Sequence, residues 1–130
     1  MAASVSTRVV SWKEAAERNE SVSSEALVIP SSTGTAVAGS PPHLGGELFE
    51  SGYRLRGFTT FLEDLRLRPA LAHYLLDQLG ALALHSAVIL ARAGVDILLL
   101  DDDVAMASGM IISPASWRTF FKPRLAEIIR

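Results

Sequence analysis

The chain has 130 residues, of which 49% are apolar and 20% charged, and this balance is typical of one modest globular domain. The net charge is -2 and there is no dense Lys/Arg block, so the sequence indicates neither a nucleic-acid partner nor an anionic membrane surface. The absence of cysteine excludes disulfides and thiolate metal sites. Without a basic start and an apolar core at the N-terminus, we expect a cytoplasmic protein rather than a secreted one.

The beginning of the chain is predicted to be an N-terminal segment, residues 1–25, that is partly flexible and precedes a second unit, residues 26–130. Within it, Ser11 and Glu14 have the spacing of a capping box, which predicts a short helix to about residue 19. Short strands are predicted at 26–29 and 35–38. Residues 41–46 are rich in Pro and Gly and predict a loop, which we expect at the same end of the sheet as the acidic residues described below.

Three helices are predicted next, over 47–55, from 58 onward, and over 69–93. The second has apolar residues at i, i+3, i+4 and i+7, and the third begins at Pro69 and ends at Gly94. Its longest mainly apolar stretch, 79–90, is too short to span a bilayer, so no membrane contact is expected. We expect its buried face to carry Leu71, Leu75, Leu79, Leu82, Ser86, Ile89 and Leu90.

The centre of the sequence is an apolar run, residues 95–100, that is interrupted only by Asp96 and is followed by Asp101, Asp102 and Asp103. The run is too short for a helix and does not alternate, which favours a parallel strand buried on both faces. Ligands bind at the carboxyl ends of such strands, so at least one acid is expected to face a substrate; the alternative is a capping residue among solvated neighbours. Alternation places Asp101 and Asp103 on one side and Asp102 on the other.

The C-terminal part is predicted to be helical from Ser113 as N-cap and Pro114 as first residue, with Pro123 restarting or kinking the helix. Trp117, Phe120 and Phe121 are expected in the core. At most three strands are predicted, and a sheet this small cannot bury both of its faces. We therefore expect an α/β fold that is helix-rich, with two to three parallel strands, and that forms a segment of a larger barrel.

Three sequence patches, in this order and spacing, resemble the uroporphyrinogen decarboxylase superfamily, which includes corrinoid-dependent methyltransferases. The first is GELFE at 46–50, LRG at 55–57, FLEDL at 61–65 and Pro69. The second is AGVD at 93–96, leading to Asp102 and Asp103. The third is ISP at 112–114, Trp117 and FKP at 121–123. The resemblance covers about residues 36–130.

This resemblance implies a TIM (β/α)8 barrel with its active site at the C-terminal mouth, and catalytic roles for Asp102 and Asp103. It implies a carboxy-lyase of tetrapyrrole (porphyrin) biosynthesis, incomplete on its own, whose decarboxylation needs no cofactor. The alternative is a cobamide-dependent methyltransferase of the methylcobamide:coenzyme M type, which uses zinc and a corrinoid; the double Asp favours this branch. The expected partner is then a small molecule, either a tetrapyrrole or a methyl-corrinoid.

Four further residues are candidates for substrate binding: Asp101, His43, Glu47 and Ser108. For His43 a solvated loop position is favoured over this role, and for Glu47 a place on a helix surface. Ser108, together with Gly109, would contact a phosphate or carboxylate group through backbone N–H groups. His73 and His85 are expected to be surface or packing residues, so no metal site is predicted in this segment. A non-enzymatic α/β interaction module remains a second alternative, and a homodimer is allowed by either function.

Overall fold

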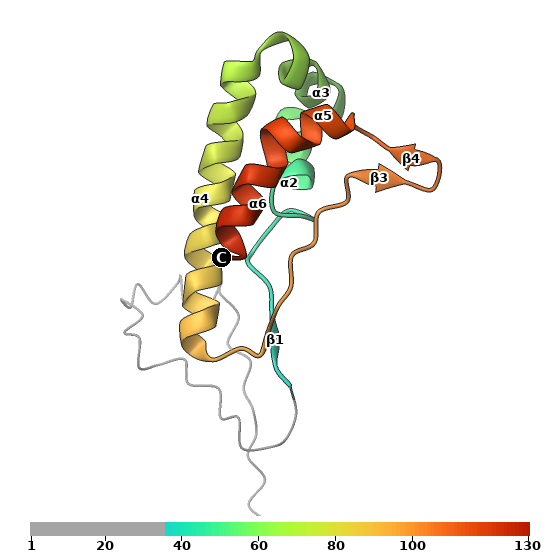
Figure 1. The fold of residues 1–130 in the computed structure, drawn as a ribbon. Coiled ribbons are helices and arrows are strands. Elements are labelled where there is room, and N and C mark those ends of the chain that lie inside the picture. Colours follow the sequence, from blue (N-terminus) through green and yellow to red (C-terminus); the bar gives the residue numbers. More distant parts are fainter. Residues whose placement is uncertain (1–35) are drawn as a thin grey trace, which may run out of the picture.

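The computed structural model describes residues 36–130 (Figure 1). Along the chain it contains strand β1, helices α2, α3 and α4, strands β2, β3 and β4, and a C-terminal helical stretch made of α5, η2 and α6. The fold is therefore helix-rich α/β, as predicted. The N-terminal segment 1–25, the helix predicted near 11–19 and the strand predicted at 26–29 lie outside the described residues.

The three predicted helices are confirmed, as α2 (Phe49–Arg56), α3 (Phe58–Leu67) and α4 (Pro69–Ala93). Gly57 separates α2 from α3 with a φ of 86°, a backbone conformation that other residues adopt only under strain. Gly94 ends α4 in the left-handed conformation, and its N–H donates to the last carbonyls of the helix. Gly57 and Gly94 thus end α2 and α4, as the sequence predicts.

The parallel sheet consists of two short strands, β1 (Ala38–Gly39) and β2 (Ile97–Leu98), with Ala38 opposite Ile97. The Asp96 carboxylate accepts a hydrogen bond of 2.8 Å from the Val37 N–H, so the one acid in the apolar run extends the pairing. The prediction of a strand buried on both faces is wrong, because Ile97 is 49% and Leu99 51% exposed. Among the described residues β2 has one neighbouring strand, and nothing covers this face.

A second, antiparallel pair was not predicted. Strands β3 (Ala105–Met106) and β4 (Gly109–Met110) form a hairpin that extends away from the helices (Figure 1). Its two-residue turn contains Ala107 and Ser108, and Gly109 follows with a φ of 137°. The sequence Ala-Ser lacks the Asn-Gly or Asp-Gly signature of such turns, which is why pattern reading missed the hairpin.

The C-terminal stretch comprises α5 (Pro114–Ser116), the π-helical turn η2 (Trp117–Phe121) and α6 (Lys122–Ile128). Its predicted start is confirmed, because Ser113 Oγ accepts a hydrogen bond of 3.0 Å from the Ser116 N–H. The predicted effect of Pro123 is confirmed as well. Pro123 has no N–H, and the Lys122 N–H donates to Trp117 O, five residues back, which widens the helix by one residue.

The hydrophobic core lies between the helices, where Phe49, Phe61 and Phe121 are fully buried. Their ring centroids are 5.8 to 6.5 Å apart, in tilted or edge-on arrangements. Phe120 is buried and Trp117 packs against this cluster, as predicted.

Helix α4 buries a different face from the one predicted. Its buried positions are mostly small residues that allow close approach of the other helices: Ala72, Leu76, Gly80, Ala83, Ala87 and Ala93. Three of the leucine and isoleucine side chains expected inside, Leu71, Leu82 and Ile89, are 41% to 52% exposed. The spacing of apolar residues identified the helix. It did not distinguish the face of α4 that packs against the other helices from the face that is exposed.

Helix α4 is also the one helix among residues 36–130 that is long and apolar enough to cross a membrane, judged by length and composition. The expectation above rested on the stretch 79–90, whereas the continuous helix has 25 residues. Core helices of water-soluble proteins share this length and composition, so the absence of membrane contact stays a prediction.

Candidate functional site

Two loops meet at the carboxyl ends of the parallel strands. One follows β1 and leads into α2; the other follows β2 and contains the three acids. They touch at Gly46, where a Cβ atom would lie 2.5 Å from Asp101 O and 2.6 Å from Asp102 Oδ1. Only glycine fits this contact. The prediction that the Pro/Gly loop lies at the same end of the sheet as the acids is therefore confirmed.

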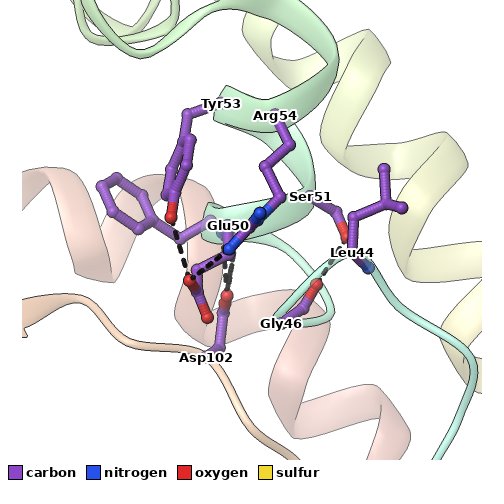
Figure 2. A network of polar contacts seen from close by, with 8 residues as sticks. Leu44, Gly46, Glu50, Ser51, Tyr53, Arg54 and Asp102 are labelled. Atoms are coloured by element: carbon purple, nitrogen blue, oxygen red, sulfur yellow. Dashed lines mark hydrogen bonds and ion pairs between the residues drawn. The ribbon is translucent and has the colours of Figure 1, made fainter.

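Asp102 binds the N-terminus of α2. Both of its carboxylate oxygens accept a hydrogen bond of 2.9 Å from the Phe49 N–H, and Oδ1 accepts one of 3.1 Å from the Glu50 N–H (Figure 2). The preceding residue, Leu48, has no side chain that could cap the helix, so Asp102 supplies the cap from 53 residues away. Burial raises the pKa of Asp102, although the backbone N–H groups act in the opposite direction.

Glu47 makes the reciprocal contact. Its Oε2 accepts a hydrogen bond of 2.8 Å from the Asp101 N–H, and the residue is only 3% exposed. Its other oxygen, Oε1, is buried and has no hydrogen-bond partner among the described residues. Burial raises the pKa of Glu47. The expectation of a helix-surface glutamate is wrong, because Glu47 lies in the turn before α2 and points at the acid loop.

The loop after β1 is held by a second set of polar contacts (Figure 2). The Ser51 hydroxyl donates to Gly46 O and accepts a hydrogen bond of 3.1 Å from the Leu44 N–H. On the next turn, the Tyr53 hydroxyl donates to Glu50 Oε1 at 2.9 Å, and Arg54 lies 3.7 Å from the same oxygen. Ser51 was not predicted, because a serine in an amphipathic helix resembles a surface residue. The available signal was the Gly45-Gly46 pair, since Ser51 binds the Gly46 carbonyl.

Of the remaining candidates, Asp101, Asp103 and His43 lie in the two loops at the strand ends, whereas Ser108 lies elsewhere. The predicted alternation is confirmed, since Asp101 and Asp103 are exposed while Asp102 is half-buried between them. His43 is half-buried in the loop after β1, near enough for its charge to lower the pKa of Glu47 against the effect of burial. Its Nδ1 is buried and has no hydrogen-bond partner in this part of the chain. Ser108 lies apart from these residues, in the turn of the β3–β4 hairpin (Figure 1).

The described residues contain no group of three or more His, Asp or Glu side chains that could hold a metal ion. His73 packs its ring 4.5 Å from that of Phe120 and contacts the Arg124 guanidinium, whereas His85 is exposed, so the predicted packing and surface roles are confirmed. Residues 36–130 thus offer carboxylates and amides for a ligand, but no donor set that fits zinc.

The acids line neither of two hollows on the described part of the molecule. One, of about 420 Å³, lies along α3 and is lined by residues such as Phe58, Leu62 and Arg66. The other, of about 250 Å³, lies between α4 and α6 beside Arg124. Asp101 and Asp103 are exposed where the parallel strands end, apart from both hollows.

Comparisons with curated proteins and with solved structures give no significant match. The model of one protein family, uroporphyrinogen decarboxylase (URO-D), matches residues 28–130. This range includes β1, the loops that meet at Gly46, all three acids and the C-terminal helical stretch. The chain therefore belongs to the uroporphyrinogen decarboxylase family.

Proposed function

We propose that this chain forms part of the substrate-binding mouth of a decarboxylase that acts on a tetrapyrrole, and that Asp103 is the carboxylate that touches the substrate. Residues 26–130 are then a segment of a TIM (β/α)8 barrel, with residues 1–25 as a separate N-terminal segment. The observation that carries the proposal is the fixed acid loop: Glu47 and Asp102 hold it against α2, while the carboxylates of Asp101 and Asp103 stay exposed.

This arrangement separates the roles of the three acids. Asp102 has both oxygens bound to backbone N–H groups, so its direct contribution is to position the loop. Asp103 is adjacent to this anchor, and its exposed side chain makes no such contact within residues 36–130, which suits a group that must meet a ligand. The catalytic role predicted for Asp102 from the resemblance stays a prediction, and we assign the contact with substrate to Asp103.

The chemistry asked of Asp103 is electrostatic. A carboxylate at the carboxyl end of a barrel strand can accept hydrogen bonds from the pyrrole N–H groups of a tetrapyrrole. It also stabilises the positive charge that the pyrrole ring gains when a ring carbon is protonated, a charge that the electron pair left by the departing CO2 then neutralises. Asp101, two residues earlier in the same loop, and His43, in the loop after β1, can bind further polar groups of the substrate. Ser108 remains a candidate only if the hairpin folds over the bound molecule.

The test is the turnover of uroporphyrinogen III, measured without oxygen, by the intact polypeptide that carries this segment. Asp103→Asn should lower kcat at least about a hundredfold, because it removes the charge from the transition state. Glu63→Gln, at an exposed position on α3, is the matched control and should leave kcat unchanged. Unchanged turnover in Asp103→Asn would make Asp103 a solvated neighbour of the capping residue.

The second candidate is methyl transfer from a methyl-corrinoid, which the paired Asp102 and Asp103 favour. In such a reaction an acid at this position orients the methyl donor or acceptor through a hydrogen-bonded partner. Residues 36–130 hold no group that fits zinc, so we derive no step through a metal from this chain. Transfer of the methyl group of methylcobalamin to a thiol, with no loss of CO2 from uroporphyrinogen III, would establish this candidate in place of the first.

For partners and location we propose a small-molecule ligand, no nucleic-acid or membrane partner, a cytoplasmic protein and a homodimer. A non-enzymatic interaction module is the remaining alternative. It would be supported by a stable homo-oligomer of the chain that neither binds a tetrapyrrole nor transfers a methyl group.

A further inference from the structure

The two loops at the strand ends are joined by two carboxylates, one from each loop, and each binds backbone N–H groups on the other side of the contact. Glu47 reaches from the loop after β1 to the Asp101 N–H, and Asp102 reaches from the loop after β2 to the Phe49 and Glu50 N–H groups. Between them Gly46 lies in direct contact with the Asp101 carbonyl and the Asp102 carboxylate. We call this pair of contacts the carboxylate clamp.

We propose that the carboxylate clamp is responsive to protons, and that Glu47 is a positioning residue that sets the place of Asp103 through the Asp101 amide. The clamp closes the acid loop onto α2 when Glu47 carries a proton, and it loosens when Glu47 ionises. Asp103, two residues beyond the amide that Glu47 holds, moves with the loop.

The geometry of Glu47 indicates where the proton resides. Oε2 accepts from the Asp101 N–H, while Oε1 is buried and has no hydrogen-bond partner among the described residues. A bare anionic oxygen in such a place has a high desolvation cost, and a proton on Oε1 reduces that cost without disturbing the bond at Oε2. The residue is 97% removed from solvent, since its exposed fraction is 3%.

The charges around the clamp do not offset this burial. On the loop after β1, His43 favours the ionised form of Glu47, and Asp102 across the contact opposes it. On α2, Glu50 opposes ionisation of Asp102, and Glu50 is itself bound to Tyr53 and Arg54. Asp101 adds an exposed negative charge on the acid loop. The pKa values of Glu47 and Asp102 are both raised, with burial as the largest cause.

The direction of the pH dependence follows from linkage. The ordinary pKa values are 4.5 for Glu47 and 3.8 for Asp102, and the clamped state raises both. The clamped state thus binds protons more tightly than a state in which the loops separate. Its stabilisation is fully present below the ordinary values and is lost as the pH rises through the raised ones.

The experiment is an NMR measurement on the full chain without substrate, between about pH 4 and about pH 8. It follows the hydrogen exchange and the chemical shift of the Asp101 and Phe49 amides. In the wild type, we expect the protection of both amides, corrected for intrinsic exchange, to fall by about tenfold for each unit by which the pKa is raised. In Glu47→Gln the amide oxygen still accepts from Asp101 but cannot titrate, so the Asp101 amide should lose less protection with rising pH than in the wild type, and the change that remains is that of Asp102.

Glu63→Gln, at an exposed position on α3, is the matched control and should titrate like the wild type. Glu47→Ala removes both the acceptor and the proton, and the Asp101 amide should lose protection throughout. Wild-type protection that does not change with pH would overturn the proposal, as would a pH dependence of the Asp101 amide in Glu47→Gln that is as large as in the wild type. If a variant fails to fold, the pH titration of the wild-type amide shifts alone decides. No turnover is measured, so failure here leaves the proposed reaction untouched, and the reverse also holds.

Discussion

The helical side and the strand side of this molecule differ in how completely they are covered. On the helical side, made of α2, α3, η2 and α6, the rings of Phe49, Phe61 and Phe121 are fully buried against one another. On the strand side, Ile97 and Leu99 of the β2 region are 49% and 51% exposed, and Met106 and Met110 of the hairpin are 62% and 44% exposed. The same chain thus has one packed face and one open face.

The difference shows which apolar surface residues 36–130 bury among themselves and which they leave exposed. The buried aromatic side chains on the packed side have lost their contact with water, which is the main source of stability in a small fold. The parallel pair has two strands, whereas parallel sheets are found with both faces covered. The carboxylate clamp lies where the two sides meet, so it ties the acid loop of the open side to a helix of the packed side.

The largest expected effect is the loss of a packed aromatic ring. Phe121→Ala leaves a cavity beside Phe49 and Phe61 and should lower the free energy of unfolding by about 3–5 kcal/mol. Its counterpart on the open side, Leu99→Ala, should change it by no more than about 0.5 kcal/mol. Urea denaturation followed by circular dichroism measures both. Equal losses would mean that the strand side is covered in solution.

A smaller effect is expected from adding one methyl group to each of two helical glycines. At Gly52 a Cβ atom would lie 2.6 Å from the Phe61 ring, so Gly52→Ala should cost about 1–3 kcal/mol. At Gly80 the nearest atom of Arg124 is 3.5 Å away, an ordinary contact. Gly80→Ala should therefore stabilise the chain by about 0.5–1 kcal/mol through helix propensity. The pair is compared by urea denaturation, and a stabilising Gly52→Ala would contradict the tight packing of α2 on α3.

The helices were predictable from the sequence because their signals are local. Pro69 and Gly94 mark the two ends of α4, and Ser113 marks the start of the C-terminal stretch. The buried face of α4 was not predictable, because small and large apolar residues share the period and the choice depends on which helix packs against them. The β3–β4 hairpin was not predictable, because its Ala-Ser turn lacks the usual turn signature.

The candidate site was predictable as a set of residues but not as a set of contacts. The alternation of the acids followed from the extended backbone alone. The cap that Asp102 provides joins positions 53 residues apart, and no short-range pattern encodes it. Glu47 was misplaced for a related reason: its helical surroundings suggested a surface position, whereas the meeting of two loops buries it.

The most direct test of the open strand side is made on the purified 130-residue chain, by thermal unfolding followed by circular dichroism, with light scattering for mass. The exposed apolar face of α4 and β2 predicts a helical signal and association of the chain into species heavier than the monomer. A cooperative melt together with a defined monomeric mass would contradict this, because the chain would then cover its own apolar surface without help.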